Sequence, residues 1–137
     1  ASQTHSTISG GTRNTAGGTA ATVCGGRWNV AATSYSAICG GDDNTAREPY
    51  ASVGGGRLND ADGDYARIGG GYLNDAQSNY ATIAGGTNNQ ARSYAFIGGG
   101  DSNDCDSKYC VIGGGSGNVA GYSGTVGGGR SNSAENS

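Results

Sequence analysis

The sequence predicts an all-β protein, a parallel β-solenoid of nine coils with about fifteen residues in each. Three observations predict this fold. An asparagine returns every 15 or 14 residues, an isoleucine or valine returns in the same register, and two glycines follow that residue in every unit. A unit this short cannot bury a core alone, so stacked neighbours must supply its interior. We expect one repeat domain over residues 1–137.

The asparagines mark the register of the repeat. With Ala51 as position 1 of the unit, they occupy position 9. A column with one asparagine in each coil can hydrogen-bond its amides up and down the stack. We expect this ladder from Asn14, Asn29, Asn44, Asn59, Asn74, Asn89, Asn103, Asn118 and Asn132.

Each coil is expected to contain two short strands. Position 3 is Ile or Val in all nine units, and the alternation around it is typical of a strand. A second strand is expected near position 11, which is alanine in eight units and Cys105 in the other. Side chains from positions 1, 3 and 11 are expected to fill a thin interior.

Glycines and a variable segment form the two turns of each coil. Positions 5 and 6 are glycine in all nine units, and position 4 is always small. Glycine permits a positive φ and lets two walls of a solenoid approach closely. The two short units lose their residue between positions 11 and 15, as expected for a surface turn.

Position 15 is tyrosine at six of the eight junctions between units. Because side chains alternate along a strand, positions 15 and 2 are expected on the face opposite the interior. An exposed aromatic stripe usually marks an interaction surface, and identical chains would bury it around a rotational axis along the rod. The predicted inter-subunit stripe consists of Tyr35, Tyr50, Tyr65, Tyr80, Tyr94 and Tyr109.

Composition and charge exclude several classes of protein. The chain has 29 glycines and a formal net charge of −3, and its eight basic residues are scattered, which argues against nucleic-acid binding. No apolar run approaches the roughly 20 residues that span a bilayer, so we expect no membrane insertion of this segment. Methionine is absent, which predicts a processed product or a segment of a longer protein.

Four cysteines predict an oxidising compartment and two disulfides. Cys24 and Cys39 occupy position 4 of consecutive coils, where Cα atoms about 4.8 Å apart fall within the disulfide range. Cys105 and Cys110 replace two interior residues that flank one turn. The alternatives are small buried residues or bridges between chains. A zinc site is poorly supported, because the single histidine, His5, accompanies neither pair.

No constellation of catalytic residues is found, so we expect no enzyme activity, no cofactor and no assigned metal site. The aspartates fall at turn or strand-edge positions, which favours a solvated surface. Asp60 and Asp75 share position 10 in adjacent coils, where like charges repel unless a cation lies between them. Calcium is the candidate cation at that place.

Residues 80–91, Tyr-Ala-Thr-Ile-Ala-Gly-Gly-Thr-Asn-Asn-Gln-Ala, resemble the head repeats of trimeric autotransporter adhesins of the YadA type. The resemblance extends over essentially the whole chain. It implies a left-handed parallel β-roll, assembled as a homotrimer at a cell or particle surface. Similar repeats occur in phage and virion fibre proteins, so a bacterial and a viral source both stay open.

These observations predict a structural and adhesive surface fibre, a non-catalytic extracellular or virion-surface rod that attaches to a host cell or surface. Its expected partners are other copies of the chain, as a homotrimer or an end-to-end filament, and a host glycan or surface receptor. The alternative is a carbohydrate-binding or polysaccharide-degrading spike built on the same rod. In that alternative exposed tyrosines would stack on sugars, and paired carboxylates roughly 5–9.5 Å apart would hydrolyse them.

Overall fold

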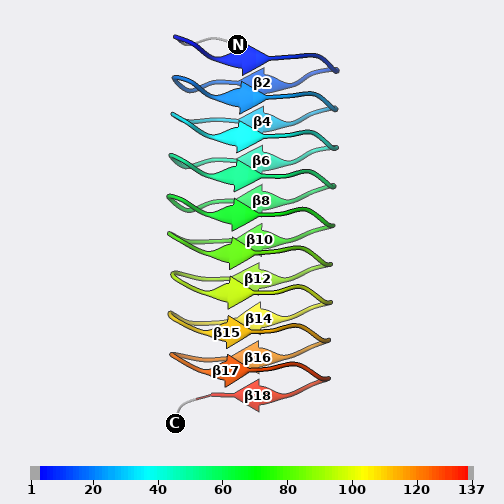
Figure 1. The fold of residues 1–137 in the computed structure, drawn as a ribbon, viewed down its shortest axis with the longest axis vertical. Helices are drawn as coiled ribbons and strands as arrows, with labels where there is room; N and C mark the ends of the chain where they lie inside the picture. Colours follow the sequence, from blue (N-terminus) through cyan, green and yellow to red (C-terminus); the bar gives the residue numbers. More distant parts are fainter. Residues whose placement is uncertain (1–3, 136–137) are drawn as a thin grey trace.

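A computed structural model of the chain describes residues 4–135. Within that range the chain forms eighteen strands of two residues each and no helix. The coils stack in sequence order into a rod, with β1 and β18 at opposite ends (Figure 1). The parallel β-solenoid of nine coils predicted from the sequence is therefore confirmed.

Each coil contributes one strand to each of two nine-stranded parallel sheets. The odd-strand sheet contains the residues at positions 2 and 3 of the repeat: β1 (Thr7–Ile8), β3 (Thr22–Val23), β5 (Ala37–Ile38), β7 (Ser52–Val53), β9 (Arg67–Ile68), β11 (Thr82–Ile83), β13 (Phe96–Ile97), β15 (Val111–Ile112) and β17 (Thr125–Val126). The even-strand sheet contains positions 10 and 11: β2 (Thr15–Ala16), β4 (Val30–Ala31), β6 (Thr45–Ala46), β8 (Asp60–Ala61), β10 (Asp75–Ala76), β12 (Gln90–Ala91), β14 (Asp104–Cys105), β16 (Val119–Ala120) and β18 (Ser133–Ala134).

Adjacent coils pair in register, so that equivalent residues lie directly above one another. Val53 pairs with Ile68, and Ile68 pairs with Ile83. Position 7 adds a third column of single parallel bridges, such as the one between Arg57 and Tyr72. This third column was not predicted, because position 7 varies in chemistry from coil to coil and gives no pattern in the sequence.

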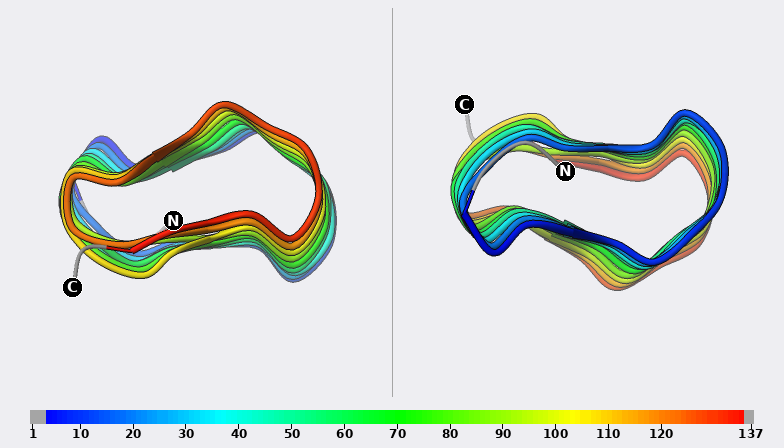
Figure 2. Two further views of the ribbon diagram at one scale, coloured as in Figure 1. Left: turned by 90° about the horizontal axis from the view of Figure 1, so that it is seen from below. Right: turned by 90° about the horizontal axis from the view of Figure 1, so that it is seen from above.

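Viewed along the rod, the coils overlie one another as one flattened outline, each slightly rotated from the last (Figure 2). The thin interior contains the residues at positions 1, 3 and 11, as predicted; Ile38, Ile83 and Ala61 are fully buried. Isoleucine is the largest side chain that is fully buried there. The larger Trp28 and Phe96 occupy positions 8 and 2, outside the interior, and are exposed.

The asparagines at position 9 form a continuous ladder inside the rod. The side-chain oxygen of Asn59 accepts hydrogen bonds from the backbone N–H and the amide of Asn74, at 3.1 and 3.2 Å. The amide of Asn74 in turn donates to the carbonyl oxygens of Gly70 and Gly86, both at 2.9 Å. Each inner asparagine thus ties its own coil to the coils before and after it.

Two corners in every coil adopt the left-handed conformation, one at position 8 and one at position 15. Leu58 at position 8 has φ of 55°, and Tyr65 at position 15 has φ of 59°. Such a φ is unfavourable for these residues unless neighbouring structure imposes it. Hydrogen bonds to the preceding coil do so here, because Leu58 N–H donates to Asp42 O at 3.1 Å and Tyr65 N–H donates to Pro49 O at 3.0 Å.

The glycine at position 6 has a steric cause. Gly56 has φ of 86°, and a Cβ atom there would overlap the carbonyl oxygen of Gly71 in the next coil. Position 4 does not always require glycine, since Ser9, Cys24 and Cys39 occupy it in three coils. In those coils the glycine at position 5 does not have a positive φ. The requirement for glycine is therefore strict at position 6 and depends on the local backbone at position 4.

The shortened units keep the ladders intact. In the unit that contains Asn89, only Arg92 and Ser93 separate β12 from the corner at Tyr94. Asn103 still donates from its backbone N–H to the side-chain oxygen of Asn89 at 3.0 Å. The missing residue is thus absorbed in the turn between the strands, as the sequence predicted.

Candidate functional site

The predicted tyrosine stripe is present, but its position within the coil differs from the prediction. The sequence placed position 15 on the strand, whereas the strands contain only positions 2 and 3 and the tyrosines lie at the left-handed corner before them. The prediction that positions 15 and 2 belong to one strand face is therefore wrong. Strand propensity favoured tyrosine in a strand, and the hydrogen bond of the corner N–H to the preceding coil overrides that propensity.

The six tyrosines form a ladder of stacked rings along the rod. Successive ring centroids from Tyr35 to Tyr109 are 4.7 to 5.2 Å apart, and the interplanar angles run from 1° to 24°. These tyrosines are 41–53% exposed. Burial and the neighbouring Tyr50 and Tyr80 raise the pKa of Tyr65. The stripe is thus an ordered aromatic surface that follows the stacking axis.

Ring stacking limits what this ladder can bind. Each inner ring has a neighbour on both faces, so its edge and hydroxyl group are what it presents to solvent. A sugar that stacks on an aromatic residue needs a free ring face. The alternative function in which the tyrosine column stacks on sugars is therefore disfavoured by this geometry.

The ladder has one more member, which the sequence did not predict. Tyr122 lies edge-on to Tyr109, with ring centroids 5.9 Å apart and an interplanar angle of 88°. The repeat is one residue short at this unit, and Ser123 takes the corner position in place of tyrosine. The shifted position hid Tyr122 from the periodic pattern.

The four cysteines are free thiols in the structure, so the two predicted disulfides stay predictions. Cys24 and Cys39 are exposed in adjacent coils. Cys105 and Cys110 are buried, and the neighbouring Cys110 thiol together with burial raises the pKa of the Cys105 thiol. The second pair thus occupies interior alanine positions, which agrees with its alternative interpretation as small buried residues.

A charged network covers the middle of the even-strand sheet. Arg47 Nη1 donates to both carboxylate oxygens of Asp62, at 2.6 and 2.7 Å, and also to Asp60. Burial and the neighbouring Asp62 raise the pKa of Asp60 to about 6, and they outweigh the opposing effect of Arg47. Asp75, which pairs with Asp60, receives a hydrogen bond from Gln77 at 2.9 Å. Arg47 therefore provides a positive charge at the place where the sequence suggested calcium.

Among residues 4–135, no group of three or more His, Cys, Asp or Glu side chains has an arrangement that could hold a metal ion. His5 lies at a left-handed corner of the first coil. The structure thus adds no metal ligands to those considered from the sequence.

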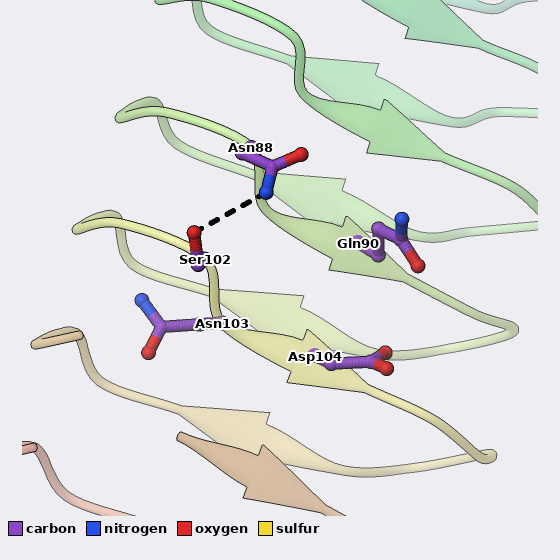
Figure 3. Close-up of a pocket in the computed structure, with 5 residues that line it drawn as sticks. All are labelled: Asn88, Gln90, Ser102, Asn103 and Asp104. Carbon is purple, nitrogen blue, oxygen red and sulfur yellow. Dashed lines mark hydrogen bonds between the residues drawn. The ribbon is translucent and has the colours of Figure 1, made fainter. Parts of the chain in front are cut away.

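A hollow of about 200 Å³ lies beside β12 and β14. Gln90 and Asp104 extend from these strands on the same side, and Asn88 donates to the hydroxyl oxygen of Ser102 at 3.2 Å (Figure 3). The Oδ1 atom of Asp104 is buried and has no hydrogen-bond partner among the described residues. The sequence pattern places Asp104 on a solvated surface and gives no sign of this hollow, because the hollow depends on how neighbouring coils stack.

Comparisons with protein-family models and with curated protein sequences find no match to this chain. The described residues contain no helix with the length and apolar character needed to cross a bilayer.

Proposed function

We propose that this chain is a non-catalytic structural and adhesive rod that acts at a cell or virion surface as a homotrimer. The observation that carries the proposal is the tyrosine ladder. Its six rings form a column along the stacking axis, with one ring in each of six consecutive coils, and each tyrosine is about half exposed. A rod whose interior is filled by its own repeat does not need these rings for its core.

The size of the stripe supports self-association. An aromatic side chain buries about 150–250 Å², so six half-exposed tyrosines present on the order of 600 Å². That is the upper end of the largest apolar patch on a typical monomer and approaches the ~800 Å² that each partner contributes to a stable interface. Copies of the chain have stripes with the same spacing, so a closed ring of rods around a shared axis covers all of them.

The rod geometry supports the adhesive part of the proposal. A stack held together by ladders between coils presents its outer side chains at fixed spacing, which lets weak contacts add up along a surface. A polysaccharide-degrading spike is less well supported, because the hollow beside Asp104 contains one carboxylate and Asp106, the second on this part of the rod, lines a different hollow.

Light scattering coupled to size-exclusion chromatography tests the assembly. We expect three times the mass of one chain, and loss of the trimer in the double variant Tyr65→Ser, Tyr80→Ser. Tyr72→Ser is the matched control, because Tyr72 is also exposed but lies at position 7, outside the ladder. A monodisperse monomer of the unaltered chain would contradict the trimer. Adhesion is tested separately by coating beads with the rod and measuring whether they retain cells. Beads that retain no cell type would contradict the adhesive function.

A further inference from the structure

Several polar side chains on the middle of the rod bond to one another. Arg27 donates to both oxygens of Asp42, at 3.0 and 2.9 Å. Further along, Arg47 bonds to Asp60 and Asp62, and Gln77 bonds to Asp75. Arg27 and Arg47 thus place a positive charge beside Asp42 and beside the pair Asp60 and Asp62, and Gln77 supplies an uncharged donor to Asp75.

The next two coils carry the same kinds of residue on β12, β14 and the turns that follow, but without such bonds. No side-chain hydrogen bond or ion pair within the described residues involves the side chains of Gln90, Arg92, Asp104 or Lys108. The Oδ1 atom of Asp104 is removed from solvent and lacks a donor, and the same holds for the Oδ1 atoms of Asp60 and Asp75 at the same position of the repeat. Asp104 differs from those two because its other carboxylate oxygen has no donor among the described residues either, whereas Arg47 and Gln77 bond to theirs. Burial is the first cause that raises the pKa of this carboxyl group, with Asp106 adding to it. An unsatisfied buried acceptor is costly, and a donor from a ligand would relieve that cost.

These side chains lie between two hollows. The first, of about 200 Å³, contains Gln90 and Asp104 together with the bonded pair Asn88 and Ser102 (Figure 3). The second, of about 280 Å³, is lined by Ser78, Arg92, Ser93, Asp106, Ser107 and Lys108.

The second hollow has its origin in the repeat. The turn at Arg92 and Ser93, which line this hollow, is one residue shorter than the turns before and after it. Asp104 lines the first hollow and Asp106, two residues further along the chain, lines the second, so the two hollows are neighbouring parts of one polar face.

The composition of this face selects the chemistry of its ligand. Its two carboxylates and two cations cancel in charge, so neither an anion nor a cation gains from long-range attraction. The remaining side chains are amides and hydroxyls, which both donate and accept hydrogen bonds. No aromatic residue lines either hollow, so binding depends on hydrogen bonds rather than on stacking.

We propose that the outer face of β12 and β14, from Asn88 and Ser102 to Lys108, binds an uncharged saccharide through its hydroxyl groups. In this arrangement a sugar hydroxyl donates to Asp104 Oδ1, the Gln90 amide bonds a neighbouring hydroxyl, and Arg92 and Lys108 donate to sugar oxygens. The inference rests on the proposed adhesive function, because it names the class of ligand that such a rod binds. It is independent of trimer formation.

The test is a titration of the intact purified chain, followed by NMR, with neutral tetrasaccharides of glucose, galactose and mannose. Tetragalacturonate and calcium chloride are titrated in parallel. We expect saturable binding of at least one neutral probe, and affinity about tenfold lower in Asp104→Ala and in Gln90→Ala, as for loss of a hydrogen bond to a charged or buried group. Arg92→Gln should also weaken binding.

Two matched controls make the result specific. Asp43→Ala removes the same charge four coils away, and Arg67→Gln changes an exposed arginine on the odd-strand sheet. Both should bind as the unaltered chain does, and circular dichroism should show every variant folded. Absence of binding by all neutral probes, binding of tetragalacturonate or calcium alone, or equal losses in the controls would overturn the inference. If the rod forms trimers and retains cells in these cases, the proposed function stands and only the saccharide site fails.

Discussion

Replacing Asn74 by alanine removes one rung from the middle of the asparagine ladder. Asn74 is fully buried. Its amide donates to Gly70 O and Gly86 O at 2.9 Å, and its side-chain oxygen accepts from the backbone N–H and the amide of Asn89, both at 3.1 Å. Alanine supplies none of these groups, and the closed interior gives water no clear route to replace them.

The size of the effect follows from what is left unpaired. The backbone N–H of Asn89 loses its acceptor inside the rod, which costs about 1–3 kcal/mol, and the Asn89 amide and Gly70 carbonyl each lose a partner. Gly86 O keeps a bond from Tyr72 N–H at 3.0 Å and adds little. We expect Asn74→Ala to lower the free energy of unfolding by about 3–5 kcal/mol.

Urea unfolding followed by circular dichroism measures this change. The matched control is Asn132→Ala in the last coil, because Asn132 is exposed and its amide donates to Gly128 O, at 2.9 Å. Within residues 4–135 no later asparagine bonds to it, so we expect a loss below about 1 kcal/mol. If the two variants lost the same stability within 0.5 kcal/mol or so, the ladder would not be the main polar tie between coils.

Three further outcomes are expected. Gly56→Ala should destabilise the rod by more than about 3 kcal/mol, because Gly56 has a positive φ and an added Cβ would overlap the next coil. Gly40→Ala should change stability by about 0.5 kcal/mol or less, because a Cβ atom there meets no atom within 4 Å. Similar losses for the two variants in thermal denaturation would contradict the steric explanation. The pKa of Asp60 is raised to about 6 in the folded chain, so folding retains its proton and the free energy of unfolding should fall as pH rises from about 4 to about 7, by on the order of 1 kcal/mol because the group is partly exposed. Asp60→Asn should remove this part of the pH dependence, and an unchanged slope in urea titrations would show that another group causes it. Under native reducing conditions iodoacetamide should modify the exposed pair, Cys24 and Cys39. Mass spectrometry should find the buried pair, Cys105 and Cys110, unmodified until urea is added. Equal rates of modification for the two pairs would mean that the coils around Cys105 and Cys110 open readily.

The period of the sequence was enough to predict the stack, the interior and the asparagine ladder. Ile68 and Ile83 could be placed in one column because equal spacing and a branched side chain leave one arrangement that buries both. Asn59 and Asn74 followed from the same spacing. These features depend on contacts between equivalent residues, which a repeat displays directly in its sequence.

Features that depend on backbone strain or on unequal coils could not be predicted in the same way. Tyr65 has strand propensity, and nothing in its neighbours signals a left-handed corner; the hydrogen bond to Pro49 O that holds it there exists only after stacking. The hollow beside Asp104 likewise depends on the stacking of neighbouring coils, and the hollow that adjoins it depends on a turn shorter than those on either side. A pattern that treats all units as equal hides such differences.

The account depends most on parallel, in-register stacking of nine coils, and distances between spin labels along the odd-strand sheet test it most directly. Labels at Thr22 and Thr82 are four coils apart, and labels at Thr22 and Thr125 are seven coils apart. With the four cysteines replaced and unlabelled chain in excess, pulsed electron resonance should give about 19 Å and about 34 Å at ~4.8 Å for each coil. Distances that do not grow in proportion to the number of coils between the labels would contradict the solenoid and the functions proposed for it.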